Sequence, residues 1–374
     1  MTRSAKIPNG LIREKTYIAY MQPEERNIAE TAYLVALARL SYQRKEAEDS
    51  LDELAELTIS AGGKVAGKVV QVRPPDPKFY IGKGMVEQLK EMISAKGANL
   101  VIFDDPLSPA QQRNLEEALE TKVIDRSILI LDIFALNART AAAKLQVELA
   151  QLEYMLPRLT GAWSHFSRQY GGVGIGSKGP GETQLEIDRR HVRTRLARLK
   201  KELVKLGQQR EIQRKGRSNL FKVSLIGYTN AGKSTLFNKL TKADVSTANA
   251  LFTTLDSTTR EVSFGYPQKI LFSDTVGFIK KLPHQLVESF KSTLEEVTLA
   301  DLLLHLVDFS DPNFAKKKHQ TENVLNDIKA QNVPKIMIYN KIDRLKEGHE
   351  GYNSENDGFY ISALNNFGLD ELKN

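Results

Sequence analysis

The residues best suited to chemistry stand in the stretch FKVSLIGYTNAGKSTL, residues 221–236. An apolar strand leads into a turn bounded by Gly227 and Gly232, and Lys233 and Ser234 open a helix. This order fits the phosphate-binding pattern G-x-x-x-x-G-K-[ST]. Backbone N–H groups of such a loop bind phosphate oxygens, and the helix adds its positive end. We expect Lys233 to reach the β- and γ-phosphates and the Ser234 hydroxyl to bind Mg²⁺. The loop residues predicted to contact the nucleotide are Gly227, Tyr228, Thr229, Asn230, Ala231, Gly232, Lys233, Ser234 and Thr235.

Two motifs downstream supply the rest of a magnesium and γ-phosphate site. Asp274 and Gly277 form D-x-x-G at the end of an apolar strand. We expect Asp274 to hold Mg²⁺ through water and the Gly277 N–H to sense the γ-phosphate. Thr254 lies in a candidate switch, residues 252–256, and would complete the Mg²⁺ shell when the γ-phosphate is present. The predicted metal residues are Ser234, Thr254 and Asp274, and the predicted catalytic residues are Lys233, Thr254, Gly277 and Asn230.

A base-reading motif follows a further predicted strand, residues 333–339, and includes Asn340, Lys341 and Asp343. The Asp343 carboxylate can accept the N1–H and the exocyclic NH₂ of guanine, an arrangement that adenine lacks. The Lys341 stem would lie along the base, and after the strand at 359–361 come Ser362 and Ala363, whose N–H could bond guanine O6. All four motifs stand in order at the carboxyl ends of strands, where open α/β sheets bind ligands, and predict a GTP and GDP site.

The residue after Gly277 affects the expected rate of hydrolysis. Phe278 stands where many GTPases place a glutamine that orients the attacking water, so we expect slow intrinsic hydrolysis and another group that positions water. Some GTPases without this glutamine carry an asparagine at the place of Asn230 and hold K⁺ between the phosphates. The alternative is that Asn230 simply suits a turn. Both interpretations stay open.

Length and composition limit the number of domains and the kinds of chemistry that the chain can support. The chain has 374 residues, enough for two or three domains, no cysteine and a net charge of +7. The absence of cysteine excludes disulfides and thiol chemistry and fits a reducing compartment. There is no membrane-spanning apolar run and no secretory signal at residues 1–10, so we expect a cytoplasmic protein, and we expect it to be a monomer.

The motifs need elements to position them, and the predicted fold class is α/β: a P-loop GTPase domain at 218–374, preceded by a small α/β domain at 1–138 and an antiparallel helical hairpin at 139–217. In the first domain the pattern predicts helices at 27–48, 50–60, 85–95 and 108–120, strands at 17–20, 64–72 and 99–103, and further apolar runs at 122–124 and 128–134. Ser50 is the expected N-cap of its helix. The turn Gly82-Lys83-Gly84 is interpreted as a helix cap and Asp104-Asp105 as a solvated turn.

The predicted hairpin carries the excess charge. Its helices, 139–158 and 183–214, have leucine seams that face each other. From residue 182 to 217 there are twelve basic and five acidic residues, and the difference equals the net charge of the chain. A run of charged residues usually forms a solvated helix face, but here basic residues outnumber acidic ones. The loop between the helices also combines six glycines at residues 171–181 with Trp163, His165, Phe166 and Tyr170. These features favour contact with nucleic acid.

Several runs make the chain resemble an HflX-type GTPase of the Obg–HflX group: YIGKG at 80–84, SPAQQRNL at 108–115, KLQVELAQL at 144–152 and GPGETQLE at 179–186. The resemblance implies binding to the large ribosomal subunit and its rRNA, and dissociation of ribosomes under stress. The glycine loop looks longer than usual, Thr253 replaces an expected smaller residue, and the chain ends at Asn374 where the last helix of a GTPase domain should begin, which indicates truncation. Two alternatives stay open: an RNA- or ribosome-binding module that uses GTP only as a conformational ligand, and ATP binding by the first domain.

Overall fold

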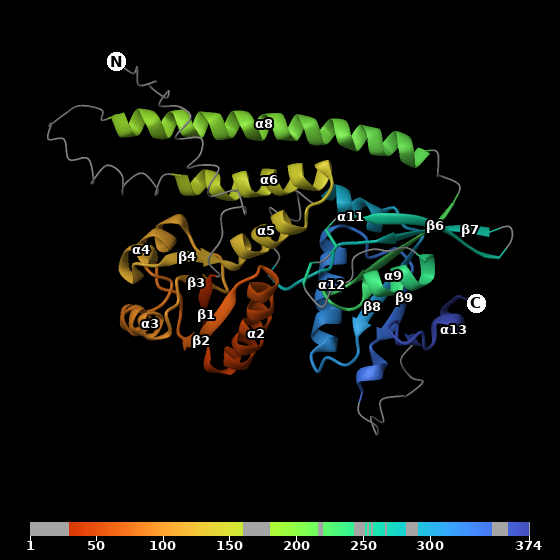
Figure 1. The fold of residues 1–374 in the computed structure, drawn as a ribbon, viewed down its shortest axis with the longest axis horizontal. Coiled ribbons are helices and arrows are strands. Elements are labelled where there is room, and N and C mark those ends of the chain that lie inside the picture. The colour runs from red at the N-terminus through yellow and green to blue at the C-terminus, as the bar shows by residue number, and fades with distance from the viewer. Residues whose placement is uncertain are drawn as a thin grey trace, which may run out of the picture.

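Two parallel-rich sheets, each covered by helices, organise the chain (Figure 1). The computed structural model describes residues 30–159, 180–215, 220–242, 251–252, 254–255, 257–265, 268–281, 291–345 and 358–373. The predicted strand at 17–20, the glycine loop with its aromatic residues, and Thr253 lie outside these ranges. We call residues 30–137 the N-terminal unit and residues 220–373 the GTPase unit. The domain boundaries themselves stay predictions.

The N-terminal unit is a four-stranded parallel sheet of order β2-β1-β3-β4. The helices α2 and α5 cover one face, and α3 and α4 cover the other, each with its own apolar cluster. In chain order its elements are β1 (Thr31–Ala38), η2 (Ser41–Gln43), α2 (Arg44–Ser60), β2 (Lys64–Val72), α3 (Lys83–Lys96), β3 (Leu100–Phe103), α4 (Pro109–Leu119), β4 (Lys122–Asp125) and α5 (Arg126–Asn137).

The predicted helix at 27–48 is wrong, because residues 31–38 form the central strand β1. This strand reads TAYLVALA and is buried on both faces, so it shows no alternation, and its apolar spacing also fits a helix. The helix that follows starts at Arg44, which places Ser50 inside α2 rather than at an N-cap. Ser50 Oγ instead donates to Asp104 Oδ2 at 2.8 Å.

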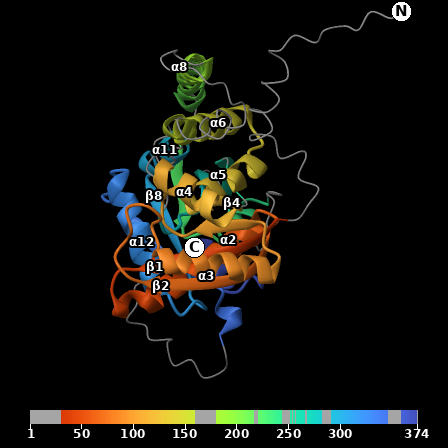
Figure 2. The same cartoon turned by 90° about the vertical axis from the view of Figure 1, so that its left-hand side faces the viewer.

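A pair of long helices lies above both units (Figure 2). The helix α6 (Ala141–Met155) continues into η3 (Leu156–Arg158), and α8 (Pro180–Lys215) runs back along it in the opposite direction (Figure 1). Their leucine seams meet, with Leu149 and Leu152 packed against Val192, Leu196 and Leu199. In the described ranges, none of the helices combines the length and apolar character that a membrane span requires.

The GTPase unit is a six-stranded sheet of order β10-β9-β8-β5-β7-β6, parallel except for β6. The helix α9 packs on one face, and α11 and α12 pack on the other. Its elements are β5 (Phe221–Gly227), α9 (Lys233–Thr241), β6 (Thr258–Gly265), β7 (Gln268–Asp274), α11 (Lys291–Thr298), β8 (Leu302–Asp308), α12 (Phe314–Asp327), β9 (Lys335–Asn340), η4 (Ile342–Arg344), β10 (Phe359–Tyr360) and α13 (Leu369–Lys373). The predicted fold class is confirmed.

Candidate nucleotide site

The phosphate loop lies between the central strand β5 and α9, and both of its glycines are required by shape. Gly227 and Gly232 have φ values of +147° and +95°, which disfavour side chains. A Cβ at Gly227 would lie 2.2 Å from Leu306 O, and one at Gly232 would lie 2.2 Å from Asn340 Nδ2. Asn230 also has a positive φ, 60°, a conformation that asparagine tolerates. The turn interpretation of Asn230 therefore accounts for its backbone, whereas K⁺ binding stays a hypothesis.

Lys233 is held inside this loop. Its Nζ donates to Gly227 O at 3.0 Å and to Tyr228 O at 2.8 Å. Burial lowers the pKa of Lys233 to about 8, and Asp274 opposes that shift. A phosphate group would add negative charge beside this ammonium and favour its charged form. The structure thus places Lys233 where the sequence predicts a phosphate ligand.

Ser234, Thr254 and Asp274 meet at one point although they come from three separate segments. Ser234 Oγ donates to Asp274 Oδ2 at 2.7 Å and lies 2.7 Å from Thr254 Oγ1. Asp274 is fully buried, and its burial raises the pKa of the carboxyl. Asp274 Oδ1 has no hydrogen-bond partner within the described part of the chain. A buried carboxylate oxygen without a partner, beside two hydroxyls, fits a hard cation such as Mg²⁺, which prefers oxygen ligands.

The segment after Asp274 is attached directly to the phosphate loop. Thr229 N donates to Phe278 O at 2.8 Å, and Phe278 N donates to Gly227 O at 3.1 Å. A Cβ at Gly277 would lie 2.9 Å from Thr229 Cα and 3.0 Å from Lys233 Nζ, so only glycine fits there. The Phe278 ring is buried in the cluster with Leu294 and Val297. The phenylalanine therefore fills the core, which leaves the positioning of water to another group.

The base-reading motif is bonded to the phosphate loop and to the last strand. Asn340 Nδ2 donates to Ala231 O at 2.8 Å, and Asn340 Oδ1 accepts from Ala363 N at 3.0 Å. Ser362 Oγ donates to Asp343 Oδ1 at 2.5 Å, and Lys341 Nζ lies 2.8 Å from Asp308 Oδ2. Guanine O6 would have to share the Ala363 N–H with Asn340. All the predicted site residues gather at one edge of the sheet, and their contacts with nucleotide and metal stay predictions.

A sheet of this order, with a phosphate loop after β5 and a carboxylate after β9 where guanine selection is predicted, is that of a P-loop GTPase. Three families match in succession: GTP-binding GTPase N-terminal at 48–135, GTP-binding GTPase Middle Region at 137–217 and 50S ribosome-binding GTPase at 222–341. GTPase HflX of Caldanaerobacter subterraneus is 46% identical over 97% of this chain and 83% of that protein. The chain therefore belongs to the HflX family of GTPases.

GTPase HflX of Escherichia coli is 44% identical over 88% of this chain and 78% of that protein. Among solved structures, a GTP-binding protein from Sulfolobus solfataricus in complex with GDP is 25% identical, covering 92% of this chain and 96% of that one, with a TM-score of 0.46. The family assignment establishes that this chain binds GTP and GDP and is a GTPase.

The structure also tests or adds to the interpretation of three residues that are not among the predicted nucleotide ligands. Asp104 is buried and bonded to Arg126 and Lys281, so its interpretation as part of a solvated turn is wrong. His305 is fully buried in β8, and its two ring nitrogens have no partner among the described residues. The interpretation of Gly82 as a helix cap agrees with the structure: it is the N-cap residue of α3 and donates its N–H to Gln71 Oε1. Only the fold shows the partners of Asp104, because Arg126 and Lys281 lie 22 and 177 residues along the chain from it.

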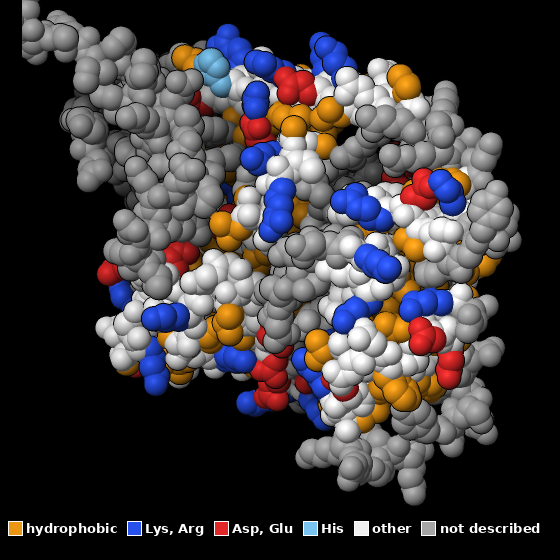
Figure 3. Space-filling view, turned by 45° about the vertical axis from the view of Figure 1, so that its right-hand side comes forward, with side chains coloured by type: hydrophobic (Ala, Val, Ile, Leu, Met, Phe, Trp, Pro, Cys, Tyr) orange, Lys and Arg blue, Asp and Glu red, His pale blue; other side chains and the backbone are white. Residues whose placement is uncertain are grey.

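The basic residues of α8 divide into two sets. Arg195 makes a bidentate pair with Glu148 of α6, at 2.6 and 2.7 Å, and Lys200 pairs with Glu153 of α6 at 2.8 Å. These cations hold the two helices together. A second set is solvent-exposed and includes Arg190, Arg193, Lys201 and Lys205, while the exposed Arg198 pairs with Glu202 of the same helix. Figure 3 shows Lys and Arg side chains gathered along the upper edge of the molecule, over α8.

Proposed function

We propose that this GTPase hydrolyses GTP with Mg²⁺ held by Ser234, Thr254 and Asp274, and that its nucleotide state controls binding to the large ribosomal subunit. When bound, the metal would neutralise phosphate charge. Lys233 holds the phosphates from the loop side, Gly277 offers its N–H where the γ-phosphate ends, and Asp343 selects guanine. The observation that supports the metal role is Asp274 Oδ1, which has no partner among the described residues and lies beside the two hydroxyls.

The ribosomal partner is supported by the charge of α8. Its exposed cations lie on a helix whose apolar seam is already used by α6, so they stay available for a polyanion. Lys and Arg that neutralise phosphates release counterions, which gives affinity for RNA without sequence readout. The match to the family described as 50S ribosome-binding GTPase agrees with this partner. We further propose that binding dissociates ribosomes, as the resemblance implies.

Co-sedimentation with purified small and large subunits tests the partner. The expected result is binding to large subunits that is stronger with a non-hydrolysable GTP analogue than with GDP. Equal binding to both subunits in both nucleotide states would contradict the proposal. Sucrose-gradient profiles of intact ribosomes, with the protein and each nucleotide, then test dissociation.

A binding module that uses GTP only as a conformational ligand is the second candidate. It is favoured by Phe278, which cannot orient water. GTP turnover with and without large subunits separates the two candidates. Strong stimulation by the subunits supports the enzyme, and nucleotide-dependent binding with little turnover in either case supports the module.

A further inference from the structure

The two segments that should respond to the γ-phosphate pack into the core of the N-terminal unit. We call the described residues 251–252 and 254–255 switch I and residues 274–281 switch II. The apolar cluster beneath α2 and α5, built around Leu54, Ile130 and Phe134, continues into the GTPase unit. Its members from that unit are Tyr228 of the phosphate loop, Leu251, Phe252 and Leu255 of switch I, and Val276 and Ile279 of switch II. Because one cluster spans both units, the switches pack against the N-terminal unit as well as against the GTPase unit.

Switch I is fixed by side chains of α2 and α5. The Phe252 ring meets Phe134 edge-to-face, with centroids 4.7 Å apart. Asn137 Nδ2 donates to Phe252 O at 2.9 Å, and Ser60 Oγ accepts from Leu251 N at 3.1 Å. Phe252 has a φ of 59°, a conformation that is unfavourable for a phenylalanine and persists only where its surroundings enforce it. Two residues later, Thr254 reaches Ser234.

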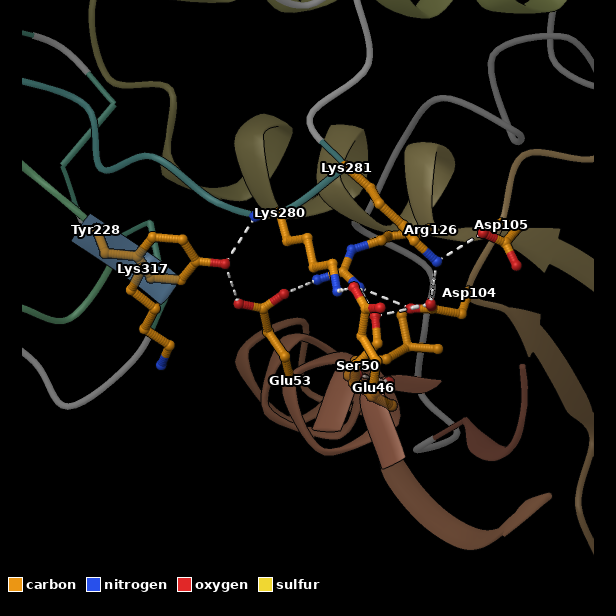
Figure 4. Close-up of polar contacts among 12 residues, drawn as sticks. Glu46, Ser50, Glu53, Asp104, Asp105, Arg126, Tyr228, Lys280, Lys281 and Lys317 are labelled. Atoms are coloured by element: carbon orange, nitrogen blue, oxygen red, sulfur yellow. Dashed lines mark hydrogen bonds and ion pairs between the residues drawn. The ribbon is translucent and has the colours of Figure 1, made fainter. Parts of the chain in front are cut away.

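Switch II is fixed by two consecutive lysines (Figure 4). Lys280 Nζ lies 2.6 Å from Glu46 Oε1 of α2, and the Lys280 N–H donates to Tyr228 Oη at 2.7 Å. Lys281 Nζ contacts Asp104 and lies 2.6 Å from Asp105 Oδ1, both at the carboxyl end of β3. The crevice at the strand ends of an open α/β sheet usually receives a ligand. Here it receives a side chain of switch II.

These contacts belong to a buried network of charged side chains. Arg126, at the start of α5, pairs with Glu53 and with Asp104, and both Arg126 and Asp104 are only 1% exposed. Tyr228 Oη donates to Glu53, which ties the phosphate loop to the same network. Burial alone would raise the pKa of the Asp104 carboxyl, but Arg126 and Lys281 outweigh it and hold this pKa below its usual value. Removing a partner from a buried carboxylate is far more costly than breaking a surface pair.

We propose that the N-terminal unit is the positioning element for both switches. Phe134 and Asn137 keep Thr254 at Ser234 and Asp274, and the carboxylates at the end of β3 keep the segment after Gly277 against the phosphate loop. This inference rests on the roles proposed above for Thr254 and Gly277. Because GDP has no γ-phosphate to meet these two residues, the contacts between the units stabilise the GTP complex more than the GDP complex.

Nucleotide affinities of interface variants test the inference in the full chain. Asn137→Ala loosens switch I, and Lys281→Met loosens switch II, with Asp105→Asn as a second variant if Lys281→Met does not fold. We expect about tenfold weaker binding of a non-hydrolysable GTP analogue with Mg²⁺, at most a small change for GDP, and slower single-turnover hydrolysis. Lys281→Arg keeps the charge and should restore most of the affinity. The matched control is Lys269→Met, which removes an exposed pair with Glu261 in the β6–β7 hairpin.

Equal losses for both nucleotides, or affinities like those of Lys269→Met, would overturn the inference. A merely structural role would lower the melting temperature of a variant without changing its preference for GTP over GDP. Thr254→Ala separates this inference from the proposed function. If Thr254→Ala weakens the GTP analogue and the interface variants do not, the positioning role is wrong. If Thr254→Ala has no effect, the proposed metal role of Thr254 fails. The inference then depends on switch II alone, and it holds only if the Lys281 variants weaken the GTP analogue more than GDP.

Discussion

At the scale of single residues, Asp343 offers a direct test of base recognition. One of its carboxylate oxygens accepts from Ser362, which orients the group. Asp343→Asn should weaken GTP by about 2 kcal/mol, the typical worth of a hydrogen bond to a charged group, and raise the relative affinity for xanthosine triphosphate. Competition between the two nucleotides measures this. Unchanged guanine selectivity would remove Asp343 from base reading.

His305 should make the stability of the fold depend on pH. Burial lowers its pKa from 6.5 to about 3, so the folded protein keeps the ring neutral while the unfolded chain protonates near pH 6.5. The unfolded state therefore binds more protons between these values, and stability falls as pH drops below 6.5. From pH 6.5 to 5.5 the loss of stability from this group should be about 1 kcal/mol. Urea unfolding of His305→Phe should show a pH slope smaller by that amount, and an identical slope would argue against a neutral buried histidine.

The potassium hypothesis for Asn230 is tested by changing the cation alone. GTP turnover is measured in potassium and in sodium at equal ionic strength, for the natural chain and for Asn230→Ala. A potassium preference that Asn230→Ala abolishes supports the ion. Equal rates in both salts, with and without large subunits, leave Asn230 as a turn residue, which its φ of 60° already accommodates.

At the scale of elements, α8 carries two kinds of cation: those that pair with α6 and those that face solvent. Replacing the exposed Arg193, Lys201 and Lys205 by glutamine should weaken binding to large subunits and flatten its salt dependence. Each lost phosphate contact changes the log–log slope by roughly one unit. Affinity for GTP should stay the same. Titration of binding at several salt concentrations gives the slope directly.

The control variant must remove the same number of charges from elements other than α8. Three exposed lysines of α2 and α3 serve, namely Lys45, Lys83 and Lys96. If their loss flattens the slope as much as the α8 variant does, net charge rather than α8 determines binding. Arg195→Gln is unsuitable because it breaks the pair with Glu148 and disturbs the helices.

Sequence patterns predicted elements best where side chains show a period or a motif. The seam of α6 and α8, the strand β2 and the four nucleotide motifs all follow from spacing. The prediction failed at β1, where burial on both faces removes the alternation that distinguishes a strand from a helix. It also missed the pairing of Asp104 with Lys281, which are 177 residues apart. Nothing local marks such a partner, since the folded arrangement of two sheets creates it.

At the scale of the whole molecule, the apolar cluster that contains both switches makes the two sheets share a core. Separate cores usually melt independently, whereas elements that bury the same apolar surface lose their stability together. Calorimetry should therefore show one transition for the N-terminal and GTPase units, with a van't Hoff enthalpy close to the calorimetric enthalpy for that peak. GTP with Mg²⁺ should shift the whole peak upward rather than split it. Two resolved transitions would mean that the shared cluster does not couple the units. A single transition means that the chain unfolds as one cooperative body, so heat that opens the N-terminal sheet also destroys the nucleotide site.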